Sequence, residues 1–307
     1  MDVGLKKQNK YTPLESQYYP AISRLFSPVV LKDIILNGYS AYFSEVCRNS
    51  GLLNSLDLSM PLSQFFDRIY SLLFKNYRNE YIYKNAITNK VLLGRHSLNT
   101  ASMLTEFRVG SCKADVVILN GTSTVYEIKS EFDSFARLNN QLRAYMQVFD
   151  HINIITSLSH VSQLKTFLPD IIGIQVLTDR NTISTIRTSK SNKANIKLDV
   201  LFNSLRKEEY ITIIKNYYGI VPDVPNTLIY TECKKLFCNI PLEEAHNLTV
   251  NILKRRNNSV LLKEFFSVAP DSLSAYGLSL NNNKTKMYSL LSNLEKSIGS
   301  ILIPKSA

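Results

Sequence analysis

The segment ADVVILNGTSTVYEIKS, residues 114–130, constrains the fold of this 307-residue chain more than any other stretch. Two apolar runs rich in β-branched residues, 114–120 and 124–130, flank the pair Asn120-Gly121. An Asn-Gly pair between such runs is the strongest short signal for a β-hairpin. Asp115 and Glu127 stand out because each places a carboxylate inside an otherwise apolar strand.

The spacing of apolar residues changes on both sides of this hairpin. Helical spacing in 60–94 gives way to a predicted strand at 102–109, just before the hairpin. After it we expect a helix at 133–149 with Asp133 as its N-cap, a strand at 151–157, a short helix at 161–169 and a strand at 172–178. This order predicts an α/β fold, with a mixed sheet of about four to five strands and flanking helices.

The remainder of the chain has helical spacing and shows no internal repeat. We therefore expect a helical N-terminal region at 1–77, a central α/β domain at 78–180 and a helical C-terminal region at 200–307. The segment at 187–199, RTSKSNKANIKLD, is polar and basic, as is typical of a loop or linker.

The composition favours a polyanionic partner. The formal net charge is +11 and the pI is about 9.3, and Lys and Arg gain free energy by displacing counterions from phosphates. No apolar run approaches the roughly 18 residues needed to span a bilayer, so we expect a cytoplasmic protein that does not enter a membrane. Four cysteines and four histidines are scattered without metal-ligand or triad spacing.

The two strand carboxylates suggest a cation site. If the hairpin loop has three residues, Asn120 to Thr122, Asp115 lies directly opposite Glu127, with Cβ atoms about 5 Å apart. Two carboxylates this close repel each other unless a cation lies between them. Mg²⁺ binds through one or two carboxylates, and Mn²⁺ is an expected substitute. Lys129 lies two residues after Glu127, on the same face of the strand.

Asp115 followed by Glu127-Ile128-Lys129 across an apolar hairpin resembles the PD-(D/E)xK nuclease superfamily. Ala114 stands where that motif often has Pro. Gln141 and Tyr145 resemble the Gln-x-x-x-Tyr signature of the RecB-like branch. Residues 105–150 look closest to an uncharacterised bacterial family of this superfamily, and the resemblance covers roughly 78–178.

The resemblance implies a restriction-endonuclease-like core and a Mg²⁺-dependent nuclease that acts on DNA. Asp115 and Glu127 would hold the metal, Lys129 would assist the attacking water, and Gln141 would complete the catalytic set. Glu80 resembles the additional first-helix carboxylate of related nucleases. The residues expected to bind nucleic acid are Gln141, Tyr145, Arg137 and Arg143, and Glu106 is a further candidate because it can reach the same face.

Other readings of these residues remain open. Glu80 and Lys84 have the spacing of a helix-supporting ion pair, Gln141 fits a surface amide, and Tyr145 fits a core aromatic. The chain could also be a silent module of the same fold that binds nucleic acid or a protein partner, or a nuclease specific for RNA or for a nucleic-acid structure. The helical flanks are the expected contact region for a protein partner.

Overall fold

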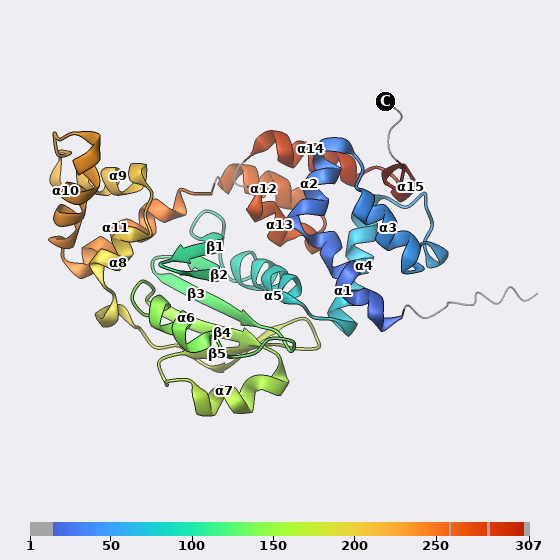
Figure 1. Ribbon diagram of the computed structural model, residues 1–307, viewed down its shortest axis with the longest axis horizontal. Helices are drawn as coiled ribbons and strands as arrows, with labels where there is room; N and C mark the ends of the chain where they lie inside the picture. Colours follow the sequence, from blue (N-terminus) through green and yellow to red (C-terminus); the bar gives the residue numbers. More distant parts are fainter. Residues whose placement is uncertain (1–14, 258, 281–282, 304–307) are drawn as a thin grey trace, which may run out of the picture. The chain divides into compact units, whose positions relative to one another are not determined.

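The computed structural model describes residues 15–257, 259–280 and 283–303 (Figure 1). The chain forms two compact units, one comprising residues 78–283 and the other the segments before and after it. The predicted N-terminal and C-terminal regions include residues 1–14 and 304–307, which lie outside the described residues. The two units are described separately below.

A six-stranded mixed sheet is the centre of the 78–283 unit. Its strands follow one another in chain order, from β1 to β6. Neighbouring strands pair antiparallel, except that β3–β4 and β4–β5 are parallel. The strands are β1 (Ser102–Val109), β2 (Cys112–Leu119), β3 (Ser123–Lys129), β4 (His151–Thr156), β5 (Gly173–Leu177) and β6 (Ile183–Arg187). The prediction of an α/β fold with a mixed sheet is confirmed.

The hairpin between β2 and β3 has the predicted geometry. Leu119 pairs with Ser123, so the loop consists of three residues, Asn120 to Thr122. Gly121 has a φ of +70°, in the left-handed region that glycine adopts without steric cost. A three-residue hairpin loop with glycine in this conformation is a common type, and it fixes the register of the two strands that carry Asp115 and Glu127.

Two predicted features were wrong. The sheet has a sixth strand, β6, whose sequence ISTIR is largely polar and half-exposed because it lies at the edge of the sheet. The helix expected from residue 133 is α6 (Leu138–Tyr145), which begins five residues later. Asp133 does not cap it, because its carboxylate accepts hydrogen bonds from the backbone N and the hydroxyl of Ser130, at 2.9 and 2.6 Å.

Helices cover the sheet of this unit. Besides α6, its α-helices are α5 (Glu80–Ile87), α7 (Val161–Phe167), α8 (Leu198–Asn203), α9 (Lys207–Tyr218), α10 (Asn226–Cys238), α11 (Leu242–Lys254), α12 (Ser259–Val268) and α13 (Ser274–Ser279). Apolar side chains of β1–β5 form one cluster with α6 and with residues of α8 to α11, while α5 and α13 contact β3 and β1. A single π-helical turn, Thr88–Leu92, follows α5.

The other unit is helical and is built from the segment before and the segment after residues 78–283. Its helices are α1 (Tyr19–Ser23), α2 (Pro28–Asn37), α3 (Ala41–Asn49), α4 (Leu62–Asn76), α14 (Lys284–Leu294) and α15 (Ile298–Ile301). Phe43 packs against Phe65 with ring centroids 5.1 Å apart, and Asn293 of α14 donates to the carbonyl of Ile34 at 2.9 Å. Across the described ranges, no helix is long and apolar enough to cross a membrane.

Candidate metal and phosphate site

Three acidic residues form a row across the first three strands. The β1–β2 register leaves Glu106 opposite Asp115. The β2–β3 register, continued by one step beyond its last pair, brings Asp115 opposite Glu127. The row lies at the ends of these strands that are away from the Asn120–Thr122 loop, and it brings together three carboxylates that are far apart in sequence.

The backbone at Glu106 is unusual for a residue within a strand. Its φ is +56°, a left-handed conformation that costs a non-glycine residue about 1 kcal/mol or more. The alternation of inward and outward side chains along β1 shifts by one residue at this point. Leu104, before Glu106, and Phe107 and Val109, after it, all belong to the same apolar cluster. Glu106 is exposed although its neighbour Phe107 is buried. The strained residue therefore keeps the carboxylate out of the core, within reach of the other acids.

Glu127 lies at the centre of a buried hydrogen-bond network. Lys129 Nζ donates to Glu127 Oε1 at 2.7 Å and lies 3.0 Å from Gln141 Oε1. Gln141 Nε2 also donates to Glu127 Oε1. The hydroxyl of Tyr145 lies 2.8 Å from Glu127 Oε2 and 2.9 Å from the carbonyl oxygen of Lys113. Gln141 is therefore not a plain surface amide, and Tyr145 is a core aromatic whose hydroxyl also orients Glu127.

Asp115 is a carboxyl whose surroundings favour its protonated form. Its Oδ2 accepts a hydrogen bond from the backbone N of Ile128 at 2.8 Å. Burial, followed by the negative charges of Glu127 and Glu80, raises the pKa of Asp115 to about 8. A bound cation would reverse this effect, because an opposite charge nearby favours the ionised carboxylate.

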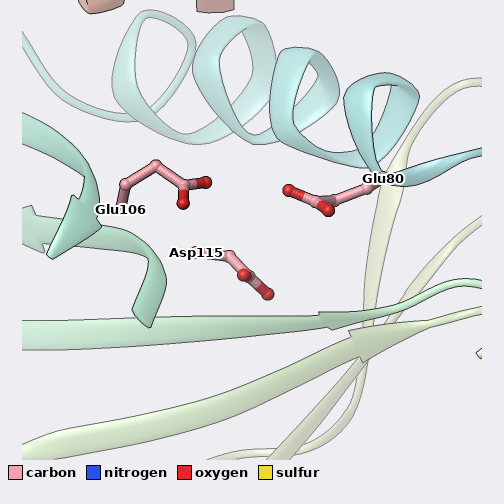
Figure 2. Close-up of side chains that lie close together, drawn as sticks. All are labelled: Glu80, Glu106 and Asp115. Carbon is pink, nitrogen blue, oxygen red and sulfur yellow. The ribbon is translucent and has the colours of Figure 1, made fainter. Parts of the chain in front are cut away.

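A second group of carboxylates adjoins Asp115. Figure 2 shows Glu80 reaching from α5 toward Asp115 and Glu106, and one oxygen of each lies within 4.8 Å of the others. Lys84 Nζ lies 2.9 Å from Glu80 and 2.7 Å from Glu106. Burial of Lys84 favours its neutral form, but the two carboxylates outweigh burial and raise its pKa. The ammonium group thus already partly neutralises this acidic group.

The four carboxylates, together with Lys129 and Gln141, line one open cavity of about 460 Å³. Arg137 lines it as expected, whereas Arg143 is exposed and lies outside the lining, and Tyr145 is buried behind Glu127. The full lining is Glu80, Glu106, Ser111, Cys112, Lys113, Asp115, Glu127, Ile128, Lys129, Asp133, Arg137, Asn140 and Gln141. Most of the residues proposed from the sequence are thus brought together, with Arg143 the exception.

The sequence interpretation missed two lysines of this site. The sequence predicts Lys84 only as a helix partner of Glu80, and it gives no local signal for Lys113. Lys113 Nζ lies 3.1 Å from Glu106 Oε2. The i, i+4 spacing of Glu80 and Lys84 was the available signal, but nothing local showed that Glu106 would join the pair.

The donor set fits a hard divalent cation. Mg²⁺ prefers carboxylate oxygens and retains several waters, and Asp115 with Glu127, or with Glu80 and Glu106, offers such oxygens beside an open cavity. Burial beside Glu127 and Glu80 raises the pKa of Asp115, and a cation bound there would favour its ionised form. Glu127 is not a member of the three-carboxylate group, so Asp115 is the carboxylate common to both arrangements.

Two known proteins each resemble part of this chain. A solved protein of unknown function from Silicibacter pomeroyi is 20% identical over 30% of this chain and 62% of its own, less than two thirds of its length. The TM-score of 0.26 is too low to support a statement about the fold. Protein cII of Enterobacteria phage P4 is 26% identical, and the match covers 58% of this chain and 80% of that protein.

The family model described as bacteriophage P4 protein cII matches residues 74–277. This range is well over half of the chain and contains all six strands together with every residue that lines the cavity. The chain therefore belongs to the family of bacteriophage P4 protein cII.

Proposed function

We propose that this protein is a metal-dependent nuclease that hydrolyses phosphodiester bonds in DNA, with a restriction-endonuclease-like core. One observation carries the proposal: Asp115, Glu127, Lys129 and Gln141 share the lining of one open cavity on the sheet. Carboxylates that can hold a metal, next to a lysine that can supply positive charge, are groups that can catalyse phosphodiester hydrolysis. The basic net charge of +11 supports a nucleic-acid substrate.

Asp115 and Glu127 would hold Mg²⁺ or Mn²⁺, with Glu80 as a further ligand and Glu106 beside it. When bound, the metal lowers the pKa of a coordinated water and stabilises negative charge on a phosphate oxygen. Metal binding requires Asp115 to lose its proton, because only the carboxylate is a ligand. The Ile128 backbone N keeps Asp115 Oδ2 in place while Oδ1 is available to a ligand.

The other residues position groups and supply positive charge. Lys129 Nζ would orient the attacking water and stabilise charge on the scissile phosphate. Gln141 and Tyr145 fix the carboxylate of Glu127 through hydrogen bonds to its two oxygens, as groups around a metal ligand commonly do. Arg137 and Lys113 are exposed lining residues whose cations would contact phosphates on either side of the reacting one.

A second candidate is a module of the same fold that binds nucleic acid without cutting it. The observation that favours it is the Glu127 network, in which Lys129, Gln141 and Tyr145 already surround both carboxylate oxygens. A site of this kind is stable without a metal. Metal binding separates the two candidates, because the binding module has no requirement for it.

The deciding experiment measures cleavage and metal binding together. Linear, nicked, branched and single-stranded DNA and single-stranded RNA are incubated with protein in Mg²⁺, Mn²⁺ or EDTA. Wild type is compared with Glu127→Gln and with Lys165→Gln, a surface control on α7. We expect metal-dependent cleavage that Glu127→Gln abolishes and Lys165→Gln retains. Failure to bind metal or to cut any of these substrates would reject the nuclease, and cleavage of RNA alone would reject DNA as the substrate.

A further inference from the structure

A second cavity lies in the 78–283 unit, away from the acidic row. Its volume is about 430 Å³. It is lined by the segment before β1, the first residues of β1, the last turn of α11 and the first turn of α12. No residue lining this cavity also lines the cavity of the acidic row, so the two are distinct.

The lining of the second cavity is suited to an anion. Lys254 and Arg255 contribute two positive charges, and the lining contains no Asp or Glu. Within the described part of the chain, neither cation forms an ion pair. The other polar lining residues carry amides or hydroxyls, which donate hydrogen bonds: Asn99, Asn251, Asn257, Ser102 and Ser259.

The fold holds these cations in place. Arg256, the next residue, has its guanidinium on Glu209 at 2.6 Å and over the ring of Phe107 at 5.2 Å. Asn257 donates through Nδ2 to the Ser102 hydroxyl at 3.0 Å and to the Met103 carbonyl at 2.6 Å. The end of α11 is therefore tied to β1, and Lys254 and Arg255 are displayed from an anchored segment. Of the three basic residues at 254–256, Arg256 therefore holds the structure together, and Lys254 and Arg255 line the cavity.

We infer that this cavity binds a phosphate group of the nucleic acid, remote from the bond that is cut. The inference rests on the nucleic-acid substrate proposed above. Ser102 and Met103 line the second cavity, and Glu106 lines the first, so β1 links the two. At about 3.3 Å per residue, Ser102 and Met103 lie roughly 10–13 Å from Glu106 along the strand. This distance is about three to four nucleotide steps of one strand at 3.4 Å each, a length that a short nucleic acid spans.

The competing explanation is that these cations stabilise the end of α11. Positive side chains in a last helical turn interact favourably with the helix dipole. Removing them would then lower stability without changing affinity for phosphate. Binding measurements in EDTA, where no metal-dependent cleavage occurs, separate the two explanations and do not depend on whether the protein cuts its substrate.

The test compares Lys254→Gln/Arg255→Gln with Lys234→Gln/Lys235→Gln, which removes the same charge from α10 in the same unit. Binding of a fluorescent single-stranded and a duplex oligonucleotide is measured by anisotropy in EDTA over a range of salt concentrations. We expect the first variant to bind about tenfold more weakly in low salt. For the duplex, the slope of log affinity against log salt concentration should become shallower by about 1–2. The α10 control should change affinity less than about threefold. Equal weakening of both variants, or unchanged affinity of the first, would overturn the inference.

A second arm distinguishes nucleic acid from a small phosphate compound. Inorganic phosphate should raise the melting temperature of wild type and of the α10 control more than that of Lys254→Gln/Arg255→Gln. General salt effects act equally on all three proteins and cancel in this comparison. If the first variant loses the phosphate effect but keeps full oligonucleotide affinity, the cavity serves a small phosphate compound and the nucleic-acid assignment is wrong. If the wild-type protein cleaves none of the substrates, the proposed nuclease is rejected, but the binding results remain valid.

Discussion

Lys129 Nζ lies 2.7 Å from Glu127 Oε1, and both side chains are almost completely buried, at 7% and 1% exposure. They are separated by one residue on β3, so they share a face of that strand. A buried ion pair contributes little net stability compared with apolar residues, but removing one partner leaves an uncompensated charge. Net stability alone therefore does not explain why the pair is buried.

Lys129→Met should destabilise the metal-free protein strongly. Glu127 would remain buried without its cation, and breaking such a pair costs about 3–5 kcal/mol. Glu127→Gln/Lys129→Met should lose less stability than Lys129→Met alone, because no charge is left unpaired. Urea unfolding in EDTA measures both free energies of unfolding. A double variant that is less stable than Lys129→Met would contradict the burial argument.

Tyr145→Phe tests whether the hydroxyl orients Glu127. Loss of its hydrogen bonds should lower the free energy of unfolding by about 1–2 kcal/mol and weaken Mg²⁺ or Mn²⁺ binding about 10–100-fold. Tyr218→Phe is the control, since it also removes a hydroxyl hydrogen bond, of 2.9 Å to the Leu236 carbonyl, but lies outside the lining of the site. Calorimetric titration with Mn²⁺ should show weaker binding for the first variant only. Equal metal affinity of the two variants would mean that Tyr145 is merely structural.

Asp115→Asn should stabilise the metal-free protein at high pH. The folded-state pKa is about 8, above the usual value near 4. The folded state therefore holds a proton that the unfolded state releases, and Asp115 costs stability increasingly as the pH rises from 4 through 8. In EDTA at pH 9 the variant should exceed wild type by on the order of 1 kcal/mol or more, with little difference at pH 4. The same difference at both pH values would contradict the assigned protonation.

The hairpin and its carboxylates could be predicted because their signals are local. Asn120-Gly121 fixes the loop, the loop fixes the register, and the register brings Asp115 opposite Glu127. The edge strand β6 could not be found in this way, since its exposed polar residues do not alternate clearly. The start of α6 was misplaced because Asp133 can cap either a helix or a turn, and only the tertiary structure selects the turn to Ser130.

The ion pair between Lys84 and Glu106 depends on contacts between residues that are distant in sequence. Lys84 and Glu106 are 22 residues apart and meet at 2.7 Å. Their meeting requires α5 to pack beside the hairpin and Glu106 to adopt a left-handed backbone. Neither condition has a signal within a window of a few residues. The sequence therefore indicated carboxylates on one face but not the lysines that neutralise them.

His246, which lies away from the acidic row, should make the stability of the protein depend on pH. It is buried at 1% exposure, with Nε2 2.9 Å from the Ser123 hydroxyl. Burial, and then the charge of Lys193, lowers its pKa. The unfolded state thus binds a proton more readily, and stability should fall as the pH drops below about 6.5, by up to about 1.4 kcal/mol per pH unit. Thermal unfolding of His246→Gln should show a weaker decline between pH 7 and 5, whereas the control His96→Gln should follow wild type.

The left-handed backbone at Glu106 gives a paired test of strain and charge. Glu106→Gly and Glu106→Ala both remove the ion pairs to Lys84 and Lys113. Only glycine relieves the backbone at a φ of +56°, so Glu106→Gly should be more stable than Glu106→Ala by about 1 kcal/mol. Both variants should bind Mn²⁺ more weakly than wild type if Glu106 belongs to the metal site. Urea unfolding and Mn²⁺ titration give the two quantities separately. Equal stability of the variants would show that the backbone relaxes at no cost, and wild-type metal affinity in both would remove Glu106 from the ligand set.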